Sequence, residues 1–146
     1  MGAHLTGTFL IDNSAWARLG LRRLRKSRID EVAAAIESGQ IVACLPFVLE
    51  AGYSAQSAQD HRNLIAELLA LPWAAIDDVV ERRAIDAQRQ LARVGHHRMP
   101  PVDILQAAIA DRHQLGILHY DRDFDLIGAG TDLTFESEWL AKAGSL

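Results

Sequence analysis

The stretch Thr8-Phe-Leu-Ile-Asp-Asn-Ser14 joins a short apolar run to an aspartate and two further polar residues. Residues 8–11 predict a short buried strand, and Asp12 opens a polar group of the kind that caps the N-terminus of a helix. The same order returns late in the chain, where Ile117-Leu-His-Tyr120 predicts a strand that runs directly into Asp121. Both stretches therefore place an acid where a buried strand is expected to end.

Short strands and helices are predicted to alternate along the rest of the chain. Further strands are expected at residues 41–44, 73–76 and 133–135, and helices at 15–25, 30–37, 47–59, 60–70, 77–94, 102–114, 123–127 and 136–142. This alternation favours βαβ units, and therefore an α/β fold with a central, mostly parallel sheet of about four to five short strands. Ligands of such sheets bind beyond the carboxyl ends of the strands, so a functional site is expected among the residues that follow strands.

The composition is that of an ordinary globular domain. The chain has 146 residues, of which 49% are apolar and 23% charged, so we expect residues 1–146 to form a single domain with its own core. The longest uncharged apolar run is too short to span a bilayer, and the N-terminus lacks the pattern of a secretory signal. These features predict a cytoplasmic protein with no membrane association. Because Cys44 is the only cysteine, an internal disulfide and a paired-cysteine zinc site are excluded.

The charged residues are unevenly distributed by type. The formal net charge is −4, which is not typical of a protein covered in positive charge for nucleic-acid binding. All but two of the 15 basic residues are arginines, which suit bidentate contacts to phosphate or carboxylate groups. Several of them cluster in Leu21-Arg-Arg-Leu-Arg-Lys-Ser-Arg28. This cluster is either a solvated helix face or a surface that contacts phosphate or a partner protein.

Four carboxylates stand at the start of apolar segments or inside them. Besides Asp12 and Asp121, they are Glu50, which is the only charged residue in the run 40–59, and Asp103, which opens an apolar helical segment. Several carboxylates in one cleft repel one another unless a divalent cation joins them. An all-oxygen ligand set suits Mg²⁺ or Mn²⁺ better than Zn²⁺. The pattern therefore predicts a divalent-metal site.

Most of these acids also have a purely structural interpretation. Asp12 and Asp103 can be helix N-caps, and Asp121 can be a turn residue, whereas no local structure calls for a charge at Glu50. Asp123 stands two residues after Asp121, so it can either reach the same cation or face solvent.

Ser14, two residues after Asp12, can orient that carboxylate or bind a ligand. It is no convincing nucleophile, because no His or Asp is placed for a known triad order.

Four segments together carry a resemblance to a known family. They are Phe9–Trp16, Leu45–Ser54, Pro101–Ala110 and Gly116–Asp125. In this order and at these spacings they resemble the PIN-domain ribonucleases and, within that family, the VapC toxins of type II toxin–antitoxin systems. The resemblance covers nearly the whole chain. It implies a PIN-like, three-layer α/β/α fold and an endoribonuclease that depends on Mg²⁺ or Mn²⁺.

The resemblance also implies roles for individual residues. The implied catalytic acids are Asp12, Glu50, Asp103 and Asp121. The implied metal ligands are Asp12, Asp103, Asp121 and Asp123, the last being an additional acid that many of these toxins carry. Ser14 matches the family's small hydroxyl residue near the first aspartate. The departures are Asn13, where Thr is commoner, and His119-Tyr120, where other branches carry Thr and a variable residue. They concern subfamily and substrate and leave the acid set intact.

An RNA substrate and two protein partners follow from the same resemblance. A bound metal would turn the acidic cleft into a phosphate site, which reconciles a net charge of −4 with an RNA substrate. The candidate RNA contacts are Arg22, Arg23, Arg25 and Arg98. Family members form homodimers and pair with a small VapB-like antitoxin, which typically lays its C-terminal segment across the active cleft. The apolar residues near the basic cluster that could form part of the antitoxin groove are Leu19, Leu21 and Leu24.

Two other functions compete with the nuclease. A phosphotransfer domain also places acids at strand ends, but it needs a lysine after a late strand, and neither Lys26 nor Lys142 is placed there. A catalytically silent PIN-like module that binds RNA or protein would keep the fold without the activity. Loss of one acid would indicate such a module, and none is missing.

Overall fold

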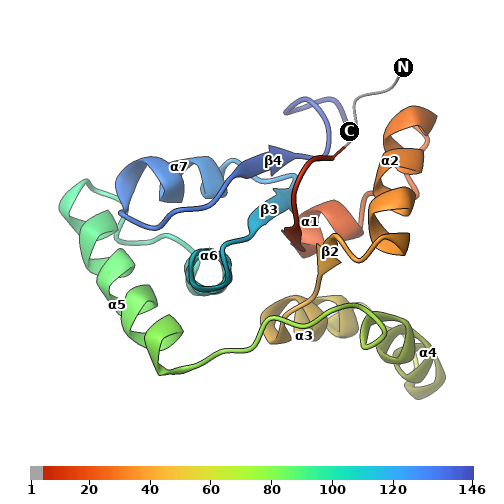
Figure 1. Cartoon of the computed structure of the whole chain (residues 1–146), viewed down its shortest axis with the longest axis horizontal. Coiled ribbons are helices and arrows are strands. Elements are labelled where there is room, and N and C mark those ends of the chain that lie inside the picture. Colours follow the sequence, from red (N-terminus) through yellow and green to blue (C-terminus); the bar gives the residue numbers. More distant parts are fainter. Residues whose placement is uncertain (1–4) are drawn as a thin grey trace.

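Four parallel strands form the centre of the structure, a computed structural model that describes residues 5–146 (Figure 1). The strands are β1 (Phe9–Ile11), β2 (Ile41–Val42), β3 (Gly116–His119) and β4 (Ser137–Trp139), in the order β2-β1-β3-β4 across the sheet. The helices are α1 (Asn13–Trp16), α2 (Lys26–Glu37), α3 (Leu45–Tyr53), α4 (Ala58–Leu68), α5 (Asp78–Arg93), α6 (Pro101–His113) and α7 (Asp123–Gly130). Figure 1 shows α5 and α6 on one side of the strands and α2 on the other. This arrangement confirms the predicted α/β fold. The first four residues of the expected domain lie outside the described residues.

The parallel register brings the carboxyl ends of all four strands to one edge of the sheet. Leu10 of β1 lies opposite Val42 of β2 and Ile117 of β3, and His119 of β3 lies opposite Trp139 of β4. The ladder continues one step past β1, where the Asp12 N–H donates to the Leu118 carbonyl at 3.0 Å. The residues that follow β1 and β3 therefore emerge side by side, as the sequence predicts.

Burial on both faces explains why the strands are apolar without alternation. All residues of β1, β2 and β3 are buried, as is usual when helices cover both faces of a parallel sheet. Gly116 opens β3 because a Cβ at this position would lie 2.6 Å from the Phe9 ring. Close packing at this point holds β1 and β3 in register.

Helix α6 is buried almost all round and passes beside the sheet. Residues 106–110 are all fully buried, so this helix shows no polar face in its central turns. It packs against α5 and contacts β1 and β3. Its first turn begins at Pro101, where a proline is well tolerated, and carries Asp103 to the carboxyl edge of the sheet. The two polar side chains Asp103 and Gln106 are thereby introduced into an apolar interior.

Three segments of the predicted element pattern are wrong. The helix expected at 15–25 is only the four residues of α1, followed by turns, because Gly20 disfavours helix and Leu24 turns back into the core. The strand expected at 133–135 and the helix expected at 136–142 are replaced by β4 and a turn-rich segment. Here residues 137–139 pair with β3, and this long-range pairing overrides the local helical pattern. The strand expected at 73–76 is reduced to a single bridge between Ala43 and Trp73.

The described helices are between 4 and 16 residues long. None of those within residues 5–146 is long and apolar enough to cross a membrane.

Candidate active site

Three acids converge at the carboxyl edge of the sheet. Asp103 from the first turn of α6, Asp121 from the loop after β3 and Asp123 from the start of α7 each offer an oxygen, and these oxygens lie within 4.8 Å of one another. The Asp123 N–H donates to Asp121 Oδ1 at 2.9 Å, which fixes the two acids relative to each other. A cluster of three carboxylate oxygens at this spacing can hold a divalent cation.

Asp12 lies next to this cluster and is buried. It is the N-cap of α1, since its Oδ2 accepts hydrogen bonds from the Ser14 N–H at 2.9 Å and from the Ser14 hydroxyl. Its Oδ1 accepts from the side-chain amide of Gln106. The structural interpretation of Asp12 is therefore confirmed, and it does not exclude a functional one. With both oxygens held by donors, this carboxylate is fixed in position beside the acid cluster.

The pKa of Asp103 shows how closely the predicted acids are gathered. Burial and then the negative charges of neighbouring carboxylates raise this pKa to about 7. The neighbours, in decreasing order of effect, are Asp12, Asp121, Asp123 and Glu50. The pKa of Asp123 is raised as well, by burial and then by Asp121. An edge with this much uncompensated negative charge favours binding of a cation.

Glu50 faces the same edge from α3 but lies outside the three-acid cluster. Burial and then the charge of Asp12 raise its pKa. It lines a mainly apolar cavity of about 510 Å³ together with Asn13, Tyr53 and Val102. Glu50 thus lines this cavity and is also close enough to Asp103 for its charge to raise the pKa of that residue.

Ser14 links two of the elements that carry acids. Its hydroxyl donates to Asp12 and accepts from the Tyr120 N–H at 2.9 Å, so it connects the start of α1 to the residue that follows β3. Contact with Asp12 is one of the two roles that the sequence predicts for it. The hydroxyl holds the backbone before Asp121 close to Asp12.

Gln106 is a site residue that the sequence interpretation missed. It is fully buried, and its amide nitrogen donates to Asp12 while its oxygen lies 3.9 Å from the Cys44 sulfur. Burial raises the pKa of Cys44 to about 12, so the thiol keeps its proton and can donate. A signal was present, because Gln106 is the polar residue three positions after Asp103 in the apolar run 104–110, and i, i+3 residues share a helix face.

His119 was noted only as a departure from the family pattern, yet it organises the loop that carries Asp121. Its Nδ1 accepts from the Asp121 N–H at 3.1 Å, so Nε2 carries the ring proton and donates to the Ser137 hydroxyl at 2.7 Å. That hydroxyl donates to Asp125 at 2.5 Å, and the Trp139 indole N–H donates to the same carboxylate at 2.8 Å. Burial lowers the pKa of His119, which keeps the imidazole neutral.

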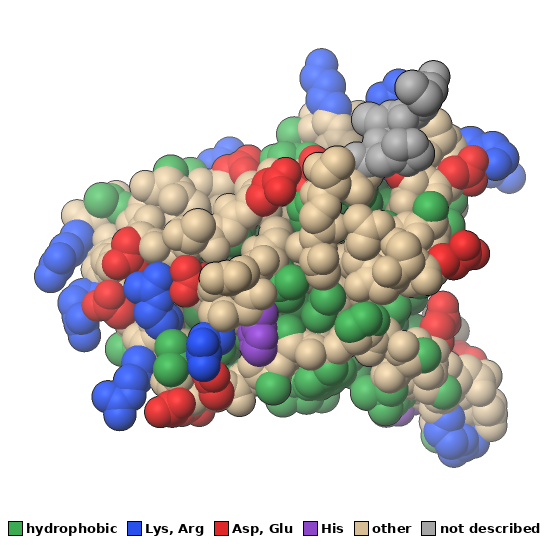
Figure 2. Space-filling view, in the orientation of Figure 1, with side chains coloured by type: hydrophobic (Ala, Val, Ile, Leu, Met, Phe, Trp, Pro, Cys, Tyr) green, Lys and Arg blue, Asp and Glu red, His purple; other side chains and the backbone are tan. Residues whose placement is uncertain are grey.

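The four arginines proposed as RNA contacts are exposed but are not gathered at one point. Arg22, Arg23 and Arg25 lie in or at the end of the turn segment between α1 and α2, whereas Arg98 precedes α6. Figure 2 shows Lys and Arg side chains around the periphery of the molecule in this view and no continuous basic face. Contact between these arginines and RNA stays a prediction.

Comparison with known proteins agrees with the fold. The sequence model of the PIN domain family matches residues 9–130. Ribonuclease VapC21 of Mycobacterium tuberculosis is 34% identical over 97% of this chain and 99% of its own length. Ribonuclease VapC51 of the same species is 33% identical over 94% of this chain and 96% of its own length.

Solved structures of low sequence identity share the fold. DNA-bound VapBC from Salmonella typhimurium aligns with a TM-score of 0.69 at 17% identity and covers 93% of this chain and 100% of that one. Mycobacterium tuberculosis VapC20, described as a sarcin–ricin loop cleaving toxin, aligns with a TM-score of 0.58 at 16% identity and covers 87% of this chain and 98% of that one. Taken with the family match and the curated relatives, these findings establish that the chain belongs to the PIN-domain family and, within it, to the VapC ribonucleases.

Proposed function

We propose that this chain is a metal-dependent endoribonuclease that acts as the toxin of a toxin–antitoxin pair. The observation that carries the proposal is the convergence of Asp103, Asp121 and Asp123 beside the firmly held Asp12 at the carboxyl edge of a parallel sheet. Relatives that match nearly the whole chain are named ribonucleases, which supports the same activity here.

The chemistry of the cluster fits Mg²⁺ or Mn²⁺. All of its donors are carboxylate oxygens, which these ions prefer, and the raised pKa of Asp103 indicates negative charge that no side chain of the cluster compensates. The ligands we assign are Asp12, Asp103, Asp121 and Asp123. When bound, the ion would stabilise charge on the phosphate and lower the pKa of a bound water.

The protein's own groups would fix the geometry of the reaction. Gln106 and Ser14 restrain Asp12, and the His119 ring accepts from the backbone N–H of Asp121, so these two ligands are held in position without the ion. Such restraint matters because catalytic groups act only when held close to the productive geometry. We assign to Glu50, whose pKa is raised, the role of accepting a proton at its carboxylate.

Partner proteins are part of the proposal. Structural neighbours include VapBC complexes from Salmonella typhimurium and Rickettsia felis, which supports a VapB-like antitoxin as the partner of this chain. We propose that this antitoxin covers the acid edge, which is the carboxyl edge of the sheet with its acid cluster. We also propose that the toxin forms a homodimer, as the family resemblance implies.

Cleavage of total bacterial RNA by the purified protein tests the activity. We expect discrete fragments with Mg²⁺ or Mn²⁺, no fragments with EDTA, and none from Asp12→Asn. Glu67→Gln, which alters an exposed acid on α4, is the control that should cleave like the wild type. Absence of both cleavage and measurable Mn²⁺ binding would instead favour a catalytically silent RNA- or protein-binding module.

A further inference from the structure

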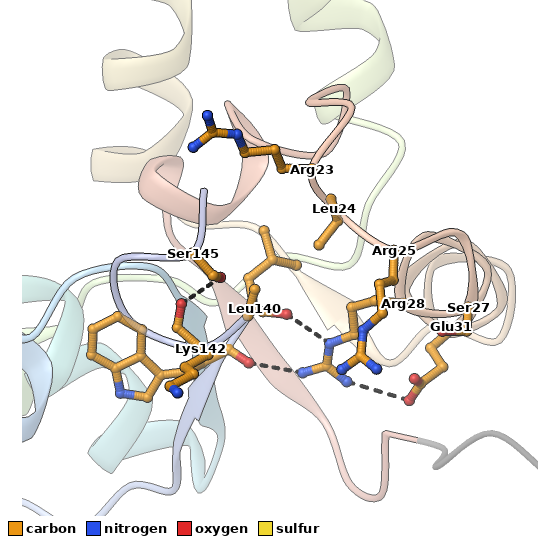
Figure 3. Close-up of a pocket in the computed structure, with 11 residues that line it drawn as sticks. Arg23, Leu24, Arg25, Ser27, Arg28, Glu31, Leu140, Lys142 and Ser145 are labelled. Atoms are coloured by element: carbon orange, nitrogen blue, oxygen red, sulfur yellow. Dashed lines mark hydrogen bonds and ion pairs between the residues drawn. The ribbon is translucent and has the colours of Figure 1, made fainter.

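A second cavity, of about 620 Å³, lies where the start of α2 meets the segment after β4. Its basic and hydroxyl side chains come from two parts of the chain that are far apart in sequence: Arg23, Arg25, Ser27 and Arg28 on one side, and Lys142 and Ser145 on the other. Figure 3 shows these two groups facing each other, with Arg23 standing apart at the rim. None of these residues belongs to the acid cluster.

Arg28 joins the two walls of this cavity. Its Nε and Nη2 each donate at 2.9 Å to a backbone carbonyl, those of Leu140 and Trp139 respectively. Its Nη1 forms a 3.3 Å ion pair with Glu31 (Figure 3). The guanidinium of Arg28 is therefore already bound within the protein, and it holds the α2 wall of the cavity against the β4 wall.

The other three cations of the cavity are not paired in this way. Arg23, Arg25 and Lys142 are exposed, and within residues 5–146 none of them forms an ion pair. Glu31 is the acidic residue of the lining, and Arg28 already pairs with it. Arg28 also lies 3.7 Å from Glu138, so its charge is compensated, and the three remaining cations leave the cavity positive although the chain as a whole has a net charge of −4. Such a local excess of positive charge attracts an anion.

The start of α2 adds to this positive potential. The N-cap of this helix, Arg25, makes no side-chain capping hydrogen bond, so the first backbone N–H groups remain available to a ligand. The helix has 12 residues, and its dipole places partial positive charge at this end. This effect reinforces the arginine and lysine side chains.

The cavity and the acid cluster lie along the same edge of the sheet. Leu140 follows β4 as Asp121 follows β3, and these strands are neighbours, with strands roughly 4.8 Å apart. The Trp139 ring, in the cavity wall, packs edge-on against Tyr120 with 5.6 Å between centroids. Tyr120 directly precedes Asp121. A polymer that crosses this edge would therefore meet the acids and the basic cavity in succession.

We propose that this cavity binds a backbone phosphate of the RNA chain whose cleaved bond lies at the acid cluster. The inference rests on the proposed nuclease function and adds the site that anchors the substrate. Without a bound ion the carboxylates repel phosphate, so metal-free affinity for RNA has to come from groups beyond them, and arginine matches phosphate in charge and geometry. The indole in the wall favours a nucleic acid over an acidic peptide, because bases stack on aromatic side chains while backbone phosphates take the cations.

Binding of a short fluorescent oligouridine, measured in EDTA so that no cleavage occurs, tests the proposal. The test variant is Arg25→Gln/Lys142→Gln, which removes two cations of the cavity and leaves Arg28 in place. The matched control is Arg62→Gln/Arg82→Gln, which removes the same charge from exposed positions on α4 and α5. Thermal unfolding verifies that each variant is folded, and Arg25→Lys/Lys142→Arg keeps both charges as a rescue.

We expect the cavity variant to bind at least about tenfold more weakly near 50 mM salt, and the control and the rescue to bind nearly like the wild type. Loss of two phosphate contacts should also reduce the slope of log K against log salt by about 1.4, at about 0.7 per contact on a single strand. Equal affinities and slopes for the cavity variant and the matched control would overturn the proposal. A cavity variant that binds RNA like the wild type but no longer binds the antitoxin would also overturn the proposal.

Metal-dependent cleavage by the wild type, assayed in parallel, separates the two proposals. If the wild type cleaves RNA but the cavity variant binds oligouridine as tightly as the wild type, the phosphate site is ruled out and the nuclease function stands. If RNA binding depends on the cavity but the wild type cleaves no RNA, the nuclease function is ruled out and the RNA-phosphate site stands.

Discussion

Asp103 is the residue on which the acid edge depends most. It is buried in the first turn of α6, where four other carboxylates act on it, and its pKa of about 7 reflects both effects. Ordinary aspartates have a pKa near 3.8, so the folded chain holds this proton far more tightly than the unfolded chain does. Without a metal, ionised Asp103 therefore destabilises the fold.

The pH dependence of stability follows with a definite sign. Because the folded pKa is raised, stability is highest below about pH 4 for this group and falls as pH rises through about 7. In EDTA, we expect Asp103→Asn to unfold at a higher temperature than the wild type above pH 7, and at a similar temperature near pH 4. Thermal unfolding followed by circular dichroism across this range measures the difference.

Glu37→Gln, at an exposed position on α2, is the control for removal of an acid and should show no such pH-dependent gain. A difference between Asp103→Asn and the wild type that stays constant with pH would contradict the role assigned to Asp103 ionisation. Asp103→Asn should also abolish cleavage, although it stabilises the metal-free chain.

Gln106 is expected to act through Asp12. Gln106→Leu has a similar shape but leaves Asp12 Oδ1 without its buried donor, so Asp12 should lose its fixed orientation. We expect Mn²⁺ affinity, measured by calorimetry, to fall by roughly 10-fold or more, as is usual when a group that orients a metal ligand is removed. Ile109→Leu, a buried apolar exchange in the same helix, controls for repacking. Unchanged Mn²⁺ affinity in Gln106→Leu would reduce Gln106 to a packing residue.

The acids could be predicted from the sequence, whereas their supports could not. Asp12 and Asp121 follow apolar strands directly, and Glu50 stands alone in an uncharged run, so each is visible locally. The bond from Gln106 to Asp12 joins residues 94 positions apart, and the partner of His119 lies on a strand that the sequence did not predict. Side chains whose roles depend on such distant contacts give no local signal beyond being polar in an apolar segment.

At the level of elements, β4 supports the acid edge through its side chains. Ser137 stands between His119 and Asp125, and Trp139 donates to the same Asp125 carboxylate, so the strand is tied both to β3 and to the start of α7. Arg28 of α2 then holds the residues that end the strand. This short edge strand thus connects three elements around the acid-bearing loop.

Removal of the Ser137 hydroxyl should weaken this connection. In Ser137→Ala the buried Nε2–H of His119 loses its acceptor, which costs about 1–3 kcal/mol of unfolding free energy. Urea unfolding measures the loss, and Ser137→Thr, which keeps a hydroxyl, should recover most of it. Ser38→Ala on the exposed end of α2 is the control. Equal stability of Ser137→Ala and the wild type would show that the hydrogen bonds from His119 through Ser137 to Asp125 contribute little to stability.

The elements that were predicted correctly differ physically from those that were missed. β1 and β3 are continuous apolar runs, and α5 is a long amphipathic helix capped by Asp77, so local pattern and tertiary structure agree. The segment 136–142 has the residues of a helix, but it becomes β4 because β3 offers a free edge and Arg28 takes up its last carbonyls. Pairing with a strand far along the chain cannot be read from a seven-residue pattern.

At the scale of the whole molecule, opposite charges are separated along one edge of the sheet. The acids gather after β1 and β3, and the basic cavity lies after β4, so a net charge of −4 conceals two local sites of opposite sign. Net charge alone therefore describes neither of the two sites. The distribution of charge is compatible with a polyanion held at one point and cut at another.

The toxin assignment makes a prediction about living cells. We expect expression of the wild-type chain without an antitoxin to arrest bacterial growth, because RNA cleavage would inhibit translation. Co-expression of its VapB-like antitoxin should restore growth. Growth curves and protein levels by immunoblot are the measurements. Asp12→Asn should be harmless at equal protein level, whereas Glu67→Gln should arrest growth like the wild type. Normal growth with abundant wild-type protein would argue against a toxin, though not against a nuclease.

The buried Cys44 provides a way to measure how often the acid edge opens. Its sulfur is fully buried at the end of β2, beside Gln106, and its pKa of about 12 leaves almost no thiolate at neutral pH. Alkylating reagents should therefore label the chain only during excursions in which the end of β2 separates from α6. Because the sequence holds no other thiol, one mass increment would report each such excursion. The dependence of the labelling rate on denaturant would then distinguish local fraying of the acid edge from unfolding of the whole chain.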